Sequence, residues 1–345
     1  MTDAATLLTD PLEEIAPPRR QHGAAAWAVW IARRLGLALL TLWLVSILVF
    51  LATAALGDPV RAILGRDYNS NPGRVAQLEA QLNSDQSLVG QYFSWLGGLL
   101  TGDPGTSLAN QQPVWGQISS NVVNTLVLVF LAAIVMIPLA FGIAMISAHY
   151  RRRRPDTVIQ TVLLAVAGIP EFVIGILLVA TFSTTVFHIF PAVTIVTQTG
   201  HPWDTPKGMV LPVLTLVLAV TPYVSRIVRA TLLEVLDSDY VELARLKGIP
   251  EPVVMRKHAL LNAVVPGIQV IGLQLAWLAG GVVLVETLFA YPGIGRQLVD
   301  AVGNHDVPMV QALTMIIAAV YIVVNLIADV ISILLTPRAR TAISS

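Results

Sequence analysis

Long apolar runs without a charged residue constrain the fold of this chain more than any other feature. A helix needs about 20 such residues to cross the roughly 30 Å hydrocarbon core of a bilayer. Five runs meet this requirement, at residues 35–56, 122–148, 208–225, 263–285 and 307–328. A sixth, at residues 157–187, contains one acid, Glu171, and its length requires tilt, a kink at Pro170 or an end outside the lipid. The sequence therefore predicts an all-α integral membrane protein with six transmembrane helices.

Composition supports a membrane protein and excludes several kinds of chemistry. Only 12% of the 345 residues are charged, and 21 basic residues balance 21 acidic ones, which gives no electrostatic argument for a nucleic-acid partner. The absence of cysteine excludes disulfides, thiolate zinc sites and a thiol nucleophile. No two of the six histidines have the spacing of a zinc-binding helix, and none of the three lysines follows a glycine as in a phosphate-binding loop. We therefore expect no enzymatic activity, and no metal or cofactor bound by this chain.

Basic residues are distributed unequally between the two sides of the predicted helices. With the N-terminus inside the cell, 16 of the 21 lysines and arginines lie on the inner side. Positive residues near the ends of spans are retained in the cytoplasm. We therefore expect a multi-pass protein of the cell (plasma or inner) membrane with both termini in the cytoplasm, as an even number of spans requires. The five basic residues outside are then Arg61, Arg66, Arg74, Lys207 and Arg296.

The same reading divides the chain into segments. An apolar stretch inside the external loop, at residues 91–100, is too short to span and is expected to pack on the outer rim of the helices. The predicted segments are a cytoplasmic tail at 1–27, a first transmembrane helix at 28–56, an external loop at 57–120, a transmembrane domain at 117–336 that contains a cytoplasmic loop at 226–262, and a second tail at 337–345.

The cytoplasmic loop carries the clearest local signals. Asp239 followed three residues later by Glu242 predicts a helix N-cap with a capping-box partner, and Gly248 followed by Pro250 predicts the end of that helix. The helix is expected at residues 240–247, and a second short helix is expected to begin near residue 251. Helical spacing places four residues on one face, namely Tyr240, Leu243, Ala244 and Lys247. From this pattern alone, the segment is either a docking knob for a partner or a plain interfacial connection.

A resemblance to a known family decides between these alternatives. The segments DYVELARLKG at 239–248 and RKHALLNAVVP at 256–266 resemble the cytoplasmic EAA loop of ABC importer permeases. The resemblance is to the dipeptide, oligopeptide and nickel permease family, in its B-type subunit, and it covers nearly the whole chain. Two departures are Leu243, where the short consensus has alanine, and Glu171, where members commonly carry a small polar residue. Other matching segments are GDPGTS at 102–107, NTL at 124–126, IPEF at 169–172, RIVRATLLEVL at 226–236 and GGVVLVETLFAYPGIGR at 280–296.

The resemblance implies a type I ABC importer permease that forms half of a translocation channel for peptides. Its partners would be a second related permease subunit, two ATP-binding cassette subunits, an external substrate-binding protein and the lipid bilayer. ATP and Mg²⁺ would be bound by the partner subunits. The residues implied in coupling to the ATP-binding subunit are Asp239, Tyr240, Glu242, Leu243, Ala244, Lys247 and Gly248.

Polar residues within the spans suggest where a substrate passes. A carboxylate near the centre of a span is costly against lipid, so Glu171 is expected to face the translocation path or a partner on a neighbouring helix. A polar stripe in the fifth span, formed by Gln269, Gln274 and Trp277, is expected on the same side. The alternative function is an ion-coupled secondary transporter in which Glu171, Glu286 and Asp329 bind protons. Without a recognisable internal repeat, this alternative has little support.

Overall fold

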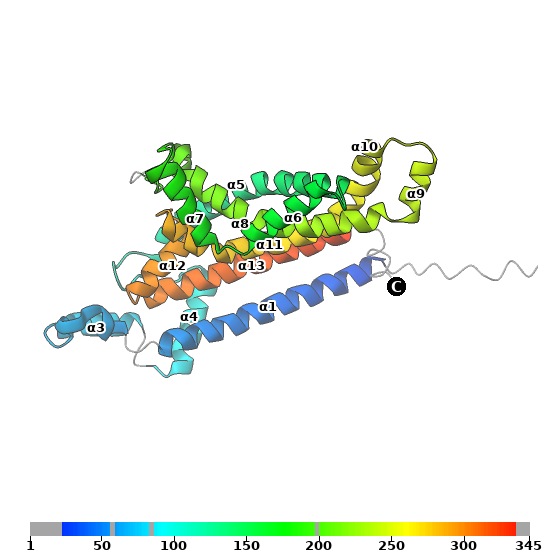
Figure 1. The fold of residues 1–345 in the computed structure, drawn as a ribbon. Coiled ribbons are helices and arrows are strands. Elements are labelled where there is room, and N and C mark those ends of the chain that lie inside the picture. The colour runs from blue at the N-terminus through cyan, green and yellow to red at the C-terminus, as the bar shows by residue number, and fades with distance from the viewer. Residues whose placement is uncertain (1–22, 56–58, 83–85, 197–199, 336–345) are drawn as a thin grey trace, which may run out of the picture.

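The computed structural model describes residues 23–55, 59–82, 86–196 and 200–335, and within these ranges the chain is helical without a β-strand (Figure 1). In this described part, four helices are long and apolar enough to cross a membrane: α1 (Gly23–Ala55), α5 (Val114–His149), α8 (Pro206–Leu236) and α13 (Val307–Leu335). The helix α11 (Leu261–Leu288) runs alongside them. The expected all-helical membrane fold is confirmed.

The sixth predicted span is broken into two helices. α6 (Arg154–Ala167) and α7 (Glu171–Val179) meet at an angle of 97°, and α7 continues into a π-helical turn, η2 (Ala180–Thr185). Pro170 lacks a backbone N–H and restricts the residue before it, so an α-helix does not continue through this point. The kink expected at Pro170 is therefore a full change of direction, and it places Glu171 in the first turn of α7.

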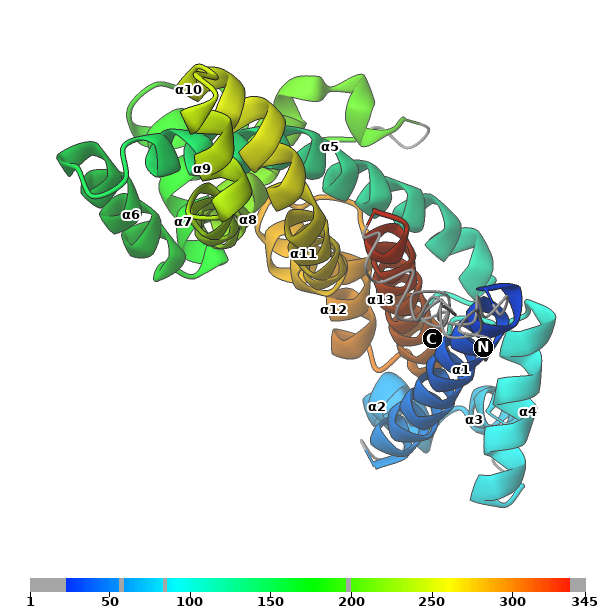
Figure 2. The same ribbon diagram turned by 90° about the vertical axis from the view of Figure 1, so that its right-hand side faces the viewer.

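α8 is the centre of the bundle. It packs against α5, α6, α7 and α11. In its most apolar stretch of 18 residues, two thirds of the residues are buried, against 6% in α13 and 17% in α1. The contacts with α5 and α11 form the largest cluster of buried apolar side chains. The exposed apolar faces of α1 and α13 are consistent with contact to lipid or to another subunit, because apolar side chains stay exposed in a membrane protein without cost. Figure 2 shows α13 between α11 and α1, on the side of the bundle away from α6.

The external loop is more ordered than its turn signals predict. It contains α2 (Pro59–Leu64), η1 (Gly65–Tyr68), α3 (Pro72–Gln81) and α4 (Leu88–Thr101). The Asn-Pro-Gly sequence begins α3, because the side chain of Asn71 accepts a hydrogen bond from the backbone N–H of Arg74 (3.2 Å) and caps the helix. Asparagine and proline favour helix starts as much as turns, so this signal was ambiguous.

α4 packs on the outer half of α1, as expected for residues 91–100. The hydroxyl of Tyr92 lies 2.8 Å from Oγ of Ser46, and the ring of Phe50 contacts the rings of Tyr92 and Trp95. The loop that follows is attached to the start of α13: the buried carboxylate of Asp306 accepts hydrogen bonds from the hydroxyl of Ser107 and from the backbone of the next residue. The second half of the external segment is therefore attached to both α1 and the start of α13.

Five short elements lie at the two ends of the bundle, of which the end that carries α9 is named the inner end and the opposite one the outer end. On the inner side, α9 (Asp239–Leu246) is followed by α10 (Glu251–Val253) and a π-helical segment, η4 (Val254–Leu260), which leads directly into α11. On the outer side, α12 (Ile294–Gly303) and the turn η3 (Pro202–Asp204) lie at the opposite end of the bundle from α9. The inner connection is thus a projecting hairpin that joins two long helices, α8 and α11.

Candidate functional site

α9 and the residues that end it form the first candidate site. The helix begins one residue earlier than expected: Ser238 occupies the N-cap position and Asp239 is the first helical residue, so the predicted capping role of Asp239 is wrong. The C-terminal end follows the prediction. Gly248 has a φ of +76°, and the N–H groups of Gly248 and Ile249 donate to the carbonyls of Arg245 (2.9 Å) and Ala244 (3.2 Å). These two bonds constitute a Schellman motif, which requires the left-handed conformation that glycine adopts without strain.

Three apolar side chains lie on the face of α9 that is directed away from the bundle. Tyr240, Leu243 and Leu246 are exposed, with 78% of Leu246 accessible. Ala244 was expected on this exposed face, but it is buried with Val241 on the opposite one. Residues three and four positions apart are neighbours on a helix surface, so the spacing of Ala244 from Tyr240 does not decide whether Ala244 lies on the exposed or the buried face. The other predicted coupling residues, Asp239, Glu242, Lys247 and Gly248, are exposed.

Ion pairs fix the base of this hairpin. Arg245 donates from Nε and Nη2 to the two carboxylate oxygens of Glu251 (3.1 and 2.9 Å), and its Nη1 donates to the carbonyl of Leu236 (3.1 Å). The hydrogen bond from Arg245 lowers the pKa of Glu251 and the pair raises the pKa of Arg245, so both remain charged at neutral pH. Arg151 forms a second pair with Asp237, whose pKa it lowers by hydrogen bonding. The hairpin is therefore braced against both α8 and the end of α5.

A buried ion pair joins the inner ends of three helices. Arg229 on α8 donates two hydrogen bonds to the carboxylate of Asp156 on α6 (2.9 and 2.6 Å), and the hydroxyl of Ser147 on α5 donates to the same carboxylate (2.5 Å). Asp156 is almost fully buried. A bidentate arginine and carboxylate pair fixes both distance and orientation. Sequence reasoning missed this pair, although Arg229 lies in one of the segments that resemble the permease family.

A cavity of about 590 Å³ lies at the break between α6 and α7. It is lined by Glu171, by Tyr223 of α8, by Gln274 of α11 and by Tyr321 of α13, together with the residues of the break itself. The structure therefore brings together two of the residues expected on a substrate path, Glu171 and Gln274. Gln269 is exposed and does not line this cavity, because a separation of five residues places it about 140° around the helix from Gln274. The side chain of Trp277 lies outside the described part of the structure.

The other intramembrane acids have partners. The buried carboxylate of Glu286 accepts hydrogen bonds from the hydroxyl of Thr125 (2.6 Å) and from the backbone N–H groups of Gly295 (2.7 Å) and Arg296 (3.2 Å). It thereby caps the N-terminal end of α12. Asp329 of α13 forms an ion pair with Arg34 of α1 (2.6 Å). Structural roles therefore account for both acids, and neither requires the alternative in which they carry protons.

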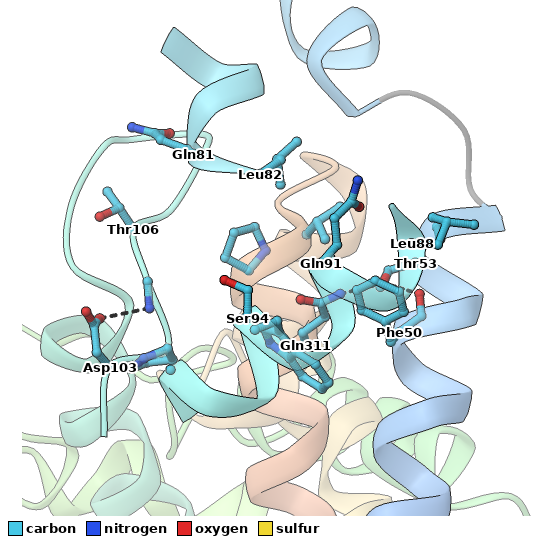
Figure 3. A pocket seen from close by; sticks show the side chains of 17 residues that line it. Phe50, Thr53, Gln81, Leu82, Leu88, Gln91, Ser94, Asp103, Thr106 and Gln311 are labelled. Atoms are coloured by element: carbon cyan, nitrogen blue, oxygen red, sulfur yellow. Dashed lines mark hydrogen bonds between the residues drawn. The ribbon is translucent and has the colours of Figure 1, made fainter. Parts of the chain in front are cut away.

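A second cavity, of about 430 Å³, lies on the outer side between α4, the loop that follows it, α1 and the start of α13 (Figure 3). Gln91, Ser94, Asp103 and Gln311 are among the side chains that border it. The amide of Gln311 is already engaged with the hydroxyl of Thr53 (2.7 Å). The sequence does not predict this cavity, because it is formed by three helices and a loop that come together only in the folded chain.

Comparison with known proteins assigns these features to a family. Residues 140–341 match the binding-protein-dependent transport system inner membrane component, and residues 28–130 match the N-terminal family of the membrane component of these systems. The chain belongs to this family. It is 35% identical over 311 residues to the glutathione transport system permease protein GsiC of Escherichia coli (strain K12), covering 90% of this chain and 98% of that protein. The corresponding protein of Salmonella choleraesuis (strain SC-B67) is 38% identical over 315 residues, with the same shares covered.

One similar solved structure is described as the crystal structure of an amino acid ABC transporter with histidines. The similarity covers 64% of this chain and 92% of the chain in that structure, with a TM-score of 0.47 and 20% sequence identity. As a member of the matched family, the permease is a membrane subunit of an ABC importer and not an enzyme, as its sequence indicated. The expected family is confirmed, and the family implies association with the other components of such a transporter.

Proposed function

We propose that this permease forms one half of a peptide translocation channel, in complex with a second related permease, two ATP-binding subunits and an external binding protein. The similarity to glutathione permeases supports a peptide cargo, because glutathione is itself a tripeptide. The cavity at the α6–α7 break has a volume in the range of small-molecule sites. It is bordered by helices of four different spans, namely the broken span, α8, α11 and α13, which is the position that a translocation path between spans would occupy.

The proposed orientation places α9 and both termini in the cytoplasm. Basic residues gather at the end of the bundle that carries α9: Arg33 and Arg34 lie near the start of α1, a run of four arginines joins α5 to α6, and Arg226 and Arg229 lie in the last turns of α8. Positive residues near span ends favour the cytoplasmic side. Because the chain contains no cysteine, single cysteines introduced at Ser238 and at Asp300 can report the two sides by labelling with an impermeant reagent.

The proposed coupling element is α9. The single observation that carries this proposal is the exposed apolar face of Tyr240, Leu243 and Leu246, held by a capped and ion-paired hairpin at the arginine-rich end. Such a face on a chain without its own phosphate-binding loop requires a partner to cover it. Closure of the two ATP-binding subunits would draw the α9 helices of the two permeases together, and the long helices would transmit that movement to the channel.

The test is ATP-dependent peptide uptake by the complete transporter reconstituted in vesicles. Leu243→Glu introduces a charge into the proposed docking face, and Leu100→Glu on the outer helix α4 is the matched control, because both leucines are exposed. We expect Leu243→Glu to abolish uptake and to separate it from ATP hydrolysis, and the control to retain uptake. Coupled uptake at the normal rate in Leu243→Glu, with the ATP-binding subunits still attached, would contradict the role of α9. The absence of peptide uptake by the unaltered transporter would contradict the proposed cargo.

A further inference from the structure

Four polar side chains surround the cavity at the α6–α7 break without a partner in the described part of the chain. Within those residues, the carboxylate of Glu171, the hydroxyls of Tyr223 and Tyr321 and the amide of Gln274 make neither a hydrogen bond nor an ion pair with another side chain. Two other carboxylates of the long helices, Glu286 and Asp329, are both paired. Polar groups at membrane depth are normally paired with other protein groups or face a water-filled cavity. The four groups therefore form a site that is not completed by this chain alone.

The cavity lies at the middle depth of the bundle. Tyr223 is close to the midpoint of α8 (Pro206–Leu236), Gln274 lies halfway along α11 (Leu261–Leu288), and Tyr321 lies halfway along α13 (Val307–Leu335). The break before α7 brings Glu171 to the same level. A carboxylate at this depth is costly unless another group compensates its charge. A ligand group that carries positive charge compensates it directly.

The groups around the cavity fit an ammonium ion better than an anion or a neutral group. Glu171 is the single charged residue among the described residues that line the cavity. The carboxylate and the amide oxygen of Gln274 accept hydrogen bonds, and a primary ammonium donates three. The rings of Tyr223 and Tyr321 are both nearly half exposed, at 47% and 43%, and aromatic rings attract cations. An anion would meet repulsion from Glu171, and none of these lining residues is basic to offset it.

We propose that this cavity binds the primary ammonium group of the cargo during translocation, with Glu171 as the direct acceptor and the two tyrosines and Gln274 around it. This inference rests on the proposed function, because it requires a cargo with a free amino group, such as a peptide. The exposure of both tyrosines leaves one side of the cavity open, so the second permease subunit would complete its wall. The external binding protein would select the peptide first, and this site would hold its amino end at the middle of the membrane.

The experiment compares uptake of one peptide with uptake of its Nα-acetylated form by the complete transporter, in the unaltered protein and in Glu171→Gln. The binding protein is the same in both, so its own preference cancels when the two discrimination ratios are divided. We expect Glu171→Gln to lower the preference for the free amino group about tenfold, which corresponds to ~1.4 kcal/mol. Glu171→Asp keeps the carboxylate and should retain most of the preference. Glu79→Gln on the external helix α3 makes the same chemical change outside the cavity and should leave the ratio unchanged.

Three other results would overturn the inference. Equal loss of uptake for both peptides in Glu171→Gln would mean that Glu171 pairs with a cationic side chain of the protein. That side chain could be Arg226, one turn after Tyr223 in α8, or a basic residue of the second permease. An unchanged ratio would mean that the carboxylate does not meet the amino group. Dependence of the ratio on a monovalent metal ion in the buffer would mean that the cavity binds that ion. In each case peptide uptake by the unaltered transporter would continue, so the proposed function would stand.

Discussion

Substitution of Gly248 tests whether the shape of the α9 hairpin is needed for coupling. Gly248 has a φ of +76°, and a Cβ added there would meet no described atom within 4 Å. The cost of a side chain is therefore conformational and not steric. Alanine in the left-handed region costs about 1–2 kcal/mol, and a β-branched valine costs up to about 3 kcal/mol. Asparagine adopts this conformation more readily than other non-glycine residues and should cost less than alanine.

These energies predict an order of activity. A penalty of about 1–2 kcal/mol lowers the ratio of capped to frayed hairpins about 5- to 30-fold, because the bonds from Gly248 to Arg245 and from Ile249 to Ala244 both depend on this conformation. We expect peptide uptake per ATP hydrolysed to decrease in the order glycine, asparagine, alanine, valine. Membrane insertion should not change, since residue 248 lies outside the spans.

The assay is uptake and ATP hydrolysis measured together in reconstituted vesicles. Gly36→Val in α1 is the matched control, because a Cβ added at Gly36 would also meet no described atom within 4 Å, but the φ of Gly36 is not positive. The order separates conformational strain from side-chain size, since asparagine is larger than alanine. If uptake followed size, with alanine better than asparagine, or if valine retained full coupling, the left-handed cap would not be required.

Three further substitutions test the supporting interactions. The pKa of Glu251 is lowered in the folded protein, so its pair with Arg245 should stabilise the hairpin above about pH 4.5 and lose this contribution at more acidic pH. Because the pair is partly exposed, the contribution is at most ~1 kcal/mol. Glu251→Gln should remove this pH dependence from the melting temperature. Thr125→Val removes a donor to the buried carboxylate of Glu286 and should lower stability by about 2–3 kcal/mol, measured as a fall in melting temperature of the detergent-solubilised complex. Asp329→Asn should retain at least half of the peptide uptake of the unaltered transporter. Uptake should also continue when the proton gradient is dissipated, provided that ATP is present. If uptake stopped on dissipation of the gradient, the result would favour the secondary transporter.

The parts of this protein that sequence reasoning predicted well depend on local signals. Uncharged runs fix the long helices, because lipid excludes charged residues and unpaired backbone groups. The end of α9 followed from Gly248, since few residues other than glycine accept its backbone conformation. The error at the start of the helix is one residue in size, because serine and aspartate are both good N-cap residues and Ser238 immediately precedes Asp239.

The parts that sequence reasoning missed depend on contacts between distant segments. Asp156 and Arg229 are 73 positions apart, and Thr125 and Glu286 are 161 positions apart. Nothing in either local sequence selects one partner among several polar residues, because the choice is made by helix packing. The cavity illustrates the same limit: Glu171 was identified by its cost in lipid, but the tyrosines that accompany it look like ordinary aromatic residues of a span.

The mechanical connection between α9 and the cavity follows from where each part of the broken span is attached. The inner part, α6, is fixed to α8 by Asp156 and Arg229, and α8 leads directly into α9. The outer part, α7, is packed closely on the outer end of α11, since a Cβ on Gly175 would lie 2.5 Å from the side chain of Leu288. Movement of α9 would therefore reach α6 through α8, whereas α7 packs on the outer parts of both α8 and α11, since a Cβ on Gly175 would also lie 3.5 Å from the side chain of Thr215. The two halves of the broken span meet at the break, so Glu171 lies where a change in tilt would alter access to the cavity from one side of the membrane to the other.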